Sequence, residues 1–141
     1  LISEKYIDAH IAAQLDEKRI ERFFHTDLAK RMLAAERLLR EYAFLTAVPA
    51  KYVQPEIAPA FQNQPVLVQG IADAVLINGD RAEIVDYKTD RGKSEEQFRE
   101  SYAQQLLLYK AAVEKRLPVK VTACTIYSFE LGCEIDVPFE K

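Results

Sequence analysis

Cysteine is scarce in this sequence, and the two thiols exclude one large group of metal sites. Cys124 and Cys133 are the only cysteines among the 141 residues, and no histidine lies near either of them. A self-contained four-cysteine zinc site or iron–sulfur cluster is therefore excluded. We interpret both thiols as small core residues of a cytoplasmic protein rather than as a disulfide.

Long apolar runs and a secretory leader are also missing. No run of apolar residues is long enough to cross a membrane, and the start of the chain does not combine a basic region with an apolar core. The first residue is Leu rather than Met, so we expect a piece of a longer protein. A composition of 49% hydrophobic and 29% charged residues is typical of a globular domain. We therefore expect residues 1–141 to form one domain that needs no membrane.

Basic residues are not in excess, because the formal net charge is -3. A domain that binds nucleic acid on its own usually carries a basic surplus that replaces the counterions of the phosphates. The charge therefore argues against independent binding of nucleic acid. It does not exclude chemistry on nucleic acid, because an empty cluster of metal-binding carboxylates counts as negative and neighbouring domains can supply the binding surface.

The first half of the sequence has a helical pattern followed by a strand. Apolar residues recur at three- and four-residue spacing from Ile2 to about Leu39. Within this stretch we predict a separate helix over Asp27–Arg40, with Thr26 as its N-cap. Glu41–Val48 is a strand candidate, and the prolines of the loop 49–65 predict little regular structure there.

The second half predicts a hairpin, a long helix and two more strands. Val66–Ile77 and Arg81–Thr89 flank the turn sequence Asn78-Gly79-Asp80. Ser94, with Gln97 three residues later, forms a capping box for a helix that runs to about Arg116. Two final strands follow: Val119–Phe129 and Cys133–Val137. This order predicts an α/β domain with a small mixed sheet flanked by helices.

Three charged side chains interrupt otherwise apolar strands of the predicted hairpin. Asp73 lies within the apolar stretch 70–77, and Asp86 and Lys88 lie within 84–88. Buried charges are costly unless they are paired or bound to a metal. Because strand side chains alternate between faces, Asp86 and Lys88 point to the same side. The hairpin brings Asp73 across from Asp86.

Two carboxylates beside a lysine suit the hydrolysis of phosphodiesters. Carboxylate oxygens bind Mg²⁺, which neutralises charge on the phosphate and lowers the pKa of a bound water. A lysine at the same place orients that water or stabilises the developing charge. The alternative is a structural role, in which Asp86 and Lys88 form a buried ion pair that holds the hairpin together.

The long helix places one polar side chain in an aromatic stripe. The stripe is spaced at three and four residues and consists of Phe98, Tyr102, Gln105, Tyr109 and Ala112. A buried glutamine needs hydrogen-bond partners. A site carboxylate, a water or a DNA phosphate would each serve, and a satisfied core glutamine remains the alternative.

Three motifs in this order resemble the PD-(D/E)xK nuclease domains of the RecB family, most closely those of AddA-type (RexA-type) subunits. The motifs are Gly70-Ile71-Ala72-Asp73, then Asp86-Tyr87-Lys88-Thr89, then Tyr102-Ala103-Gln104-Gln105-Leu106 with Tyr109. The resemblance implies a restriction-endonuclease-like core and a single nuclease domain over residues 1–141. The four-cysteine iron–sulfur motif of AddB-type and Cas4-type nucleases is not matched.

The resemblance also implies roles for particular residues. Asp73, Asp86 and the carbonyl of Tyr87 would bind Mg²⁺, with Mn²⁺ as an alternative ion, and Lys88 would be the catalytic lysine. The implied catalytic residues also include Gln105.

Other residues are expected to border the site. Gln105 and Tyr109 match a QxxxY motif that contacts DNA, and Tyr102 precedes that motif. Glu41 matches an RE-x-x-F motif. Arg91 and Lys93, in the loop after Lys88, are candidate phosphate contacts, with a solvated loop as the alternative.

The family's early metal-binding histidine has no counterpart in its usual context. His10 and His25 are the only histidines, and each is interpreted as a surface or packing residue. We expect the family histidine to precede Leu1, so that the N-terminal part of the nuclease domain is missing and metal binding is weakened.

The implied function is that of an exonuclease within an ATP-dependent helicase–nuclease that processes DNA double-strand breaks. Helicase domains of the same parent chain would use the ATP and deliver single-stranded DNA, and an AddB-like subunit would be the partner. The first alternative is a catalytically inactive module of the same fold that docks a partner subunit or holds single-stranded DNA. A stand-alone restriction-type or phage nuclease is a further alternative, which the acidic charge disfavours.

Overall fold

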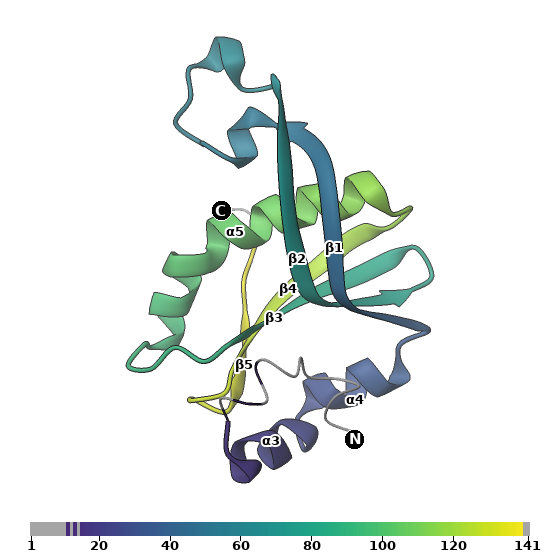
Figure 1. Ribbon diagram of the computed structural model, residues 1–141, viewed down its shortest axis with the longest axis vertical. Helices are drawn as coiled ribbons and strands as arrows, with labels where there is room; N and C mark the ends of the chain where they lie inside the picture. Colours follow the sequence, from purple (N-terminus) through teal and green to yellow (C-terminus); the bar gives the residue numbers. More distant parts are fainter. Residues whose placement is uncertain (1–10, 12, 14, 140–141) are drawn as a thin grey trace.

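The computed structural model describes residues 11, 13 and 15–139, which form a sheet with helices on both faces (Figure 1). The helices are α3 (Glu17–Phe24), α4 (Asp27–Ala34) and α5 (Glu95–Arg116), with short 3-10 turns η1 (Ala50–Tyr52) and η2 (Pro59–Phe61). The strands are β1 (Arg37–Pro49), β2 (Pro65–Asn78), β3 (Arg81–Lys88), β4 (Lys120–Ser128) and β5 (Cys133–Asp136).

The five strands form one mixed sheet in the order β1-β2-β3-β4-β5. Strands β3 and β4 are parallel, and the other neighbours are antiparallel. Parallel neighbours need a crossover connection, which α5 provides between β3 and β4. The predicted α/β class with a small mixed sheet is confirmed.

Two apolar cores lie on opposite faces of the sheet. Helix α5 packs its buried side chains, among them Phe98 and Leu106, against Val75 and Ile84. Helices α3 and α4 pack on the other face against Ala74, Val85, Tyr87 and Tyr127. Alternate residues of β2 and β3 thus serve different cores, as strand geometry requires. Asp86 and Lys88 share the phase of Ile84 and therefore face α5.

The hairpin and the capping box agree with the sequence prediction. Strands β2 and β3 pair up to Asn78↔Arg81, and Gly79 closes the turn with a φ of 63°. At the start of α5, the Ser94 side chain accepts from the Gln97 amide while the Gln97 side chain accepts from the Ser94 amide. The turn and the helix start therefore lie where their local sequence signals predict them.

The predicted helix over Asp27–Arg40 is wrong in its second half. Thr26 does cap α4, but the helix ends at Ala34 and β1 already begins at Arg37. Residues 37–40 instead continue the ladder against β2, with Arg37 opposite Ile77. The Glu36 side chain fixes the start of the strand by accepting from the Gly79 amide at 2.7 Å. Pairing with β2 therefore overrides a local helical pattern.

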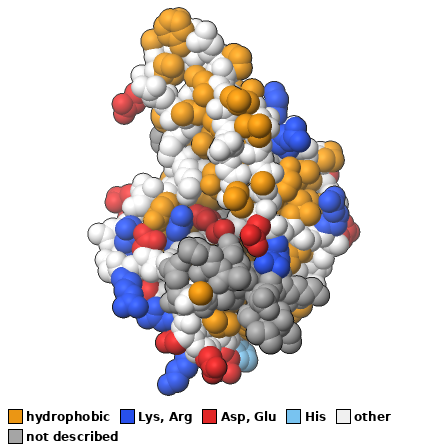
Figure 2. Space-filling model, viewed as in Figure 1, with side chains coloured by type: hydrophobic (Ala, Val, Ile, Leu, Met, Phe, Trp, Pro, Cys, Tyr) orange, Lys and Arg blue, Asp and Glu red, His pale blue; other side chains and the backbone are white. Residues whose placement is uncertain are grey.

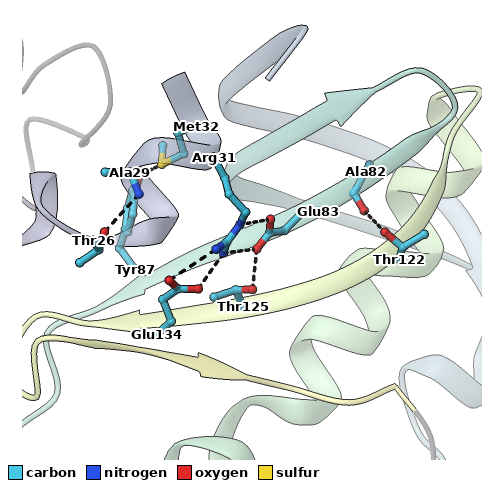
Figure 3. Close-up of polar contacts among 10 residues, drawn as sticks. All are labelled: Thr26, Ala29, Arg31, Met32, Ala82, Glu83, Tyr87, Thr122, Thr125 and Glu134. Atoms are coloured by element: carbon cyan, nitrogen blue, oxygen red, sulfur yellow. Dashed lines mark hydrogen bonds and ion pairs between the residues drawn. The ribbon is translucent and has the colours of Figure 1, made fainter. Parts of the chain in front are cut away.

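An arginine fastens α4 to the sheet (Figure 3). The Arg31 guanidinium donates to both carboxylate oxygens of Glu83 on β3, at 3.0 and 2.9 Å, and to Glu134 of β5 at 2.7 Å. Thr125 donates a further hydrogen bond to Glu83 at 2.6 Å. The hydrogen bond with Glu83 is the largest factor that raises the pKa of Arg31 above its already high usual value. This charged cluster lies on the face opposite α5.

Strands β1 and β2 extend beyond the rest of the sheet as a two-stranded ribbon that carries η1 and η2 at its tip (Figure 1). Apolar side chains are frequent on this ribbon, whereas charged side chains gather around the body (Figure 2).

Within the described part of the chain, no helix is both long and apolar enough to cross a membrane.

Candidate active site

The site lies where β2 separates from β3. The last paired residues of the two strands are Ala74 and Val85, so the register continues to Asp73 opposite Asp86, but no ladder pair forms there. The Asp73 carboxylate takes the place of a backbone acceptor, because the Tyr87 amide donates to Asp73 Oδ2 at 2.8 Å. We call this end of the ladder, with one carboxyl on each strand, the notch.

The pairing of β1 with β2 is irregular beside Asp73. The β1–β2 ladder is interrupted between the pairs Arg40↔Ala74 and Tyr42↔Ala72, where Glu41 would face Asp73. Glu41 has a φ of 49°, the only positive value among the described non-glycine residues. Ala72 and Val75 serve the same core although they are three residues apart, so β2 changes phase at Asp73. Unusual backbone conformations of this kind often occur at functional sites.

Asp86 and Lys88 form a buried ion pair on the face of the sheet that packs against α5. Lys88 Nζ lies 3.0 Å from Asp86 Oδ2, and their side chains are 17% and 10% exposed. The contact is not a well-directed hydrogen bond, and among the described residues Asp86 Oδ2 has no hydrogen-bond partner. The Lys88 ammonium is thus the charged partner of this oxygen, and no directed hydrogen bond from the described residues fixes the oxygen in place.

Burial and the neighbouring Asp86 raise the energy of the charged form of Asp73. Burial, a hydrogen bond with Asp86 and repulsion from Asp86 raise the pKa of Asp73 from 3.8 to about 7, against the lowering effects of the Tyr87 amide and Lys88. A cation between the carboxylates would remove this repulsion. The electrostatics therefore favour either a proton or a metal ion at this position.

Helix α5 adds a network that sequence reasoning did not identify. Lys88 Nζ lies 3.9 Å from the centroid of the Tyr102 ring. The Tyr102 hydroxyl donates to Asp90 Oδ2 at 2.6 Å, and Lys93 Nζ lies 3.1 Å from the same oxygen. Burial and the hydrogen bond to Asp90 raise the pKa of Tyr102 to about 12, so the phenol remains a donor at neutral pH. The signal in the sequence was Asp90, an acid two residues after Lys88.

Gln105 and Tyr109 continue the same face of α5. Gln105 Nε2 lies 3.5 Å from the Tyr109 hydroxyl, while Gln105 Oε1 is buried and lacks a hydrogen-bond partner among the described residues. Gly70 allows this helix to approach, because a Cβ at that position would lie 2.8 Å from Phe44 Cζ and 3.3 Å from the Tyr109 ring. The predicted stripe on α5 is thus confirmed as a sheet-facing surface.

Other predicted residues lie at the margin of the site. Glu41 is opposite Asp73 in register, but its half-exposed side chain pairs with Arg40 at 3.2 Å. Arg91 is exposed, and Lys93 is engaged with Asp90. His25 is exposed at the C-cap of α3, on the face of the sheet opposite α5, and His10 lies outside the described residues.

The donor set was tested for its fit to a hard divalent cation. The described residues contain no group of three His, Cys, Asp or Glu side chains suited to a metal ion. Mg²⁺ is often held by only one or two carboxylates, with waters and substrate phosphates as the other ligands. Two opposed carboxyls, and the buried oxygens of Asp86 and Gln105 that lack a hydrogen-bond partner among the described residues, fit that mode of binding. The Tyr87 ring points to the α4 face, where its hydroxyl contacts Met32 Sδ, so only its backbone borders the notch.

Comparison with known proteins identifies the family. Residues 2–134 match the PD-(D/E)XK nuclease superfamily. The chain belongs to this superfamily. In the nuclease notation, (D/E)XK corresponds in spacing to Asp86-Tyr87-Lys88, whereas Ala72 precedes Asp73 where the notation has proline. The mixed sheet with flanking helices agrees with the restriction-endonuclease-like fold of such nucleases.

Three relatives of this nuclease are each named as the A-type subunit of an ATP-dependent helicase/nuclease. The protein from Ligilactobacillus salivarius is 35% identical over 136 residues, which are 96% of this chain and 11% of the relative. The one from Pelotomaculum thermopropionicum is 40% identical over 127 residues, 88% of this chain and 10% of the relative. The one from Clostridium botulinum is 32% identical over 139 residues, 96% of this chain and 11% of the relative. The chain thus spans about a tenth of the length of these relatives.

Proposed function

We propose that the chain is a Mg²⁺-dependent deoxyribonuclease domain that hydrolyses phosphodiester bonds during the processing of DNA double-strand breaks. It would act as the exonuclease part of an ATP-dependent helicase–nuclease in the cytoplasm. The observation that carries the proposal is the convergence of Asp73, Asp86 and Lys88 in one notch facing α5. Superfamily membership and the names of the relatives support the reaction class.

Asp73, Asp86 and the Tyr87 carbonyl would hold Mg²⁺, with Mn²⁺ as an alternative. A bound divalent cation supplies Lewis-acid chemistry, by which a phosphodiester becomes open to attack by water. The chain's own residues do the rest. The Lys88 ammonium, 3.0 Å from Asp86, stabilises negative charge that develops on the phosphate and holds the attacking water. Gln105, whose buried Oε1 has no hydrogen-bond partner among the described residues, would orient water or substrate.

Substrate contacts would extend from the notch along α5 and the loop after β3. The hydroxyl of Tyr109 and the side chains of Arg91 and Lys93 are donors for phosphate oxygens. The net charge of -3 argues against tight binding of DNA by this domain alone. Helicase domains of the parent chain would deliver a single strand, and an AddB-like subunit would complete the complex.

Calorimetric titration of Mg²⁺ and Mn²⁺, together with cleavage of labelled single-stranded DNA, tests the proposal. Wild type should bind one or both ions and cut DNA, whereas Asp86→Ala should do neither. Asp136→Ala is the matched control, because Asp136 is an exposed strand aspartate on β5. Lys88→Ala should keep metal binding but lose about 10²- to 10³-fold in cleavage rate. If wild type binds neither ion but a chain extended upstream through a helix that carries a histidine does bind and cut, the site is active but incomplete in this chain. An extended chain that also binds no ion, or Asp86→Ala that cuts as fast as wild type, would support the inactive docking module instead.

A further inference from the structure

The catalytic lysine of the proposed site has two partners with different chemistry. Its ammonium lies 3.0 Å from Asp86 Oδ2 and 3.9 Å from the centroid of the Tyr102 ring. The carboxylate belongs to β3, whereas the ring belongs to α5. Only one of these partners, Asp86, would also bind the cation. The proposed function therefore places a cation and the ammonium in competition for the same carboxylate.

We propose that Tyr102 is a positioning residue, whose ring holds the Lys88 ammonium in the site when Asp86 is engaged with a divalent cation. This inference rests on the proposed function. A ring face attracts an ammonium through its quadrupole but offers a hard cation no oxygen ligand, so it does not compete for the metal. A lysine held only by Asp86 would lose its partner when the carboxylate turns to the cation, and its flexible stem would carry it toward solvent.

The Tyr102 ring is itself held by two contacts, as a positioning role requires. Its hydroxyl donates to Asp90 Oδ2 at 2.6 Å, and Lys93 holds that carboxylate from the other side at 3.1 Å. Its ring stacks against the buried Phe98, with centroids 6.3 Å apart and an interplanar angle of 30°. The hydrogen bond to a carboxylate also makes the ring richer in electrons, which strengthens its attraction for a cation.

NMR of the lysine side chains provides a direct test on the 141-residue chain. A proton above an aromatic ring is shifted upfield, so the Hε signals of Lys88, assigned by their loss in Lys88→Arg, should lie upfield in wild type. Tyr102→Phe keeps the ring and should keep most of that shift, whereas Tyr102→Leu should abolish it. Tyr42→Leu is the matched control, because Tyr42 packs on the same core and should leave the Lys88 signals in place.

The same spectra with saturating Mg²⁺ test the competition. We expect the carboxyl carbon of Asp86 to shift while the Hε signals of Lys88 stay upfield. In the cleavage assay, Tyr102→Leu should lower kcat about 3- to 30-fold with little change in KM, and Tyr102→Phe should recover most of this loss. A tyrosine that only packs in the core would leave the Lys88 signals unchanged in both variants.

Three results would overturn the inference, and they are distinguishable. Identical Lys88 signals in wild type and Tyr102→Leu would show that the ring does not hold the ammonium. Loss of the upfield shift on addition of Mg²⁺, with a shift of the Asp86 carboxyl carbon, would show that the Tyr102 ring does not hold the Lys88 ammonium once Asp86 binds the cation. An Asp86 carbon that ignores Mg²⁺ would refute the proposed function, and the positioning role would fall with it.

Discussion

Replacement of Asp73 by asparagine should stabilise the metal-free protein while abolishing metal binding. The pKa of Asp73 is raised from 3.8 to about 7, first by burial and then by Asp86. A tenfold change in acidity corresponds to about 1.4 kcal/mol, so the ionised carboxylate costs up to about 4 kcal/mol in the folded state. Because asparagine is itself a buried polar side chain, we expect Asp73→Asn to recover only about half of this cost, about 2 kcal/mol at pH 8. Asparagine keeps an acceptor for the Tyr87 amide.

The sign of the pH dependence follows from the raised pKa. Below about pH 4 the Asp73 carboxyl is protonated in both the folded and unfolded states, so wild type and Asp73→Asn should be equally stable. As the pH rises toward 7 the unfolded chain ionises first, and wild type should lose stability relative to the variant. Above about pH 7 the difference should be constant.

Urea unfolding in EDTA, followed by circular dichroism between pH 4 and 8, measures this difference. Asp136→Asn is the control for removal of one exposed negative charge. Addition of Mg²⁺ or Mn²⁺ at pH 8 should raise the stability of wild type and leave Asp73→Asn unchanged. The reasoning is refuted if Asp73→Asn is less stable than wild type at pH 8 without metal, since the carboxyl pair would then be a stabilising contact.

Three further predictions concern the scaffold, and urea unfolding checks each of them. Gly70→Ala should cost about 1–3 kcal/mol, because its Cβ would press on Phe44 at 2.8 Å; an unchanged midpoint would show that the ring yields freely. Glu41→Val should cost about 1–2 kcal/mol, whereas Glu41→Gly should be nearly neutral, because only glycine adopts a φ of 49° without strain; equal effects would contradict the argument from backbone strain. Arg31→Ala should cost about 1–2 kcal/mol after allowance for its partial exposure, because Glu83 and Glu134 lose their common partner; Lys30→Ala, which removes an exposed pair, is its control and should change little.

The parts of the fold that were predictable have their cause within a few residues. The hairpin between β2 and β3 follows from a turn that Gly79 can close, and the start of α5 follows from the reciprocal hydrogen bonds of Ser94 and Gln97. Alternation along β3 placed Asp86 and Lys88 on one face, and the structure confirms this placement. Each of these inferences needed only the period of one element or the chemistry of one turn.

The features that were not predicted from the sequence depend mainly on contacts between distant segments. Residues 37–40 have a helical pattern, yet they form a strand because β2 offers them a ladder. The Tyr102–Asp90 contact joins two segments that the sequence places in separate elements, a helix and a loop. The local sequence did not predict the left-handed backbone conformation of Glu41, because glutamate has no preference for that conformation.

Glu41 and Asp73 connect the fold to the chemistry. In a regular antiparallel ribbon, side chains alternate between the two faces, so Ala72 and Val75 would point to opposite faces. Both residues nevertheless contact the α5 core. The interruption opposite Glu41 lets β2 change phase at Asp73. The strand therefore buries an apolar side chain in the α5 core both before and after this aspartate. The strained backbone of Glu41 on β1 thus lies opposite Asp73 on β2, whose carboxylate has an unfavourable charged form beside Asp86. Both costs lie beside the carboxyl pair that we propose to hold a divalent cation.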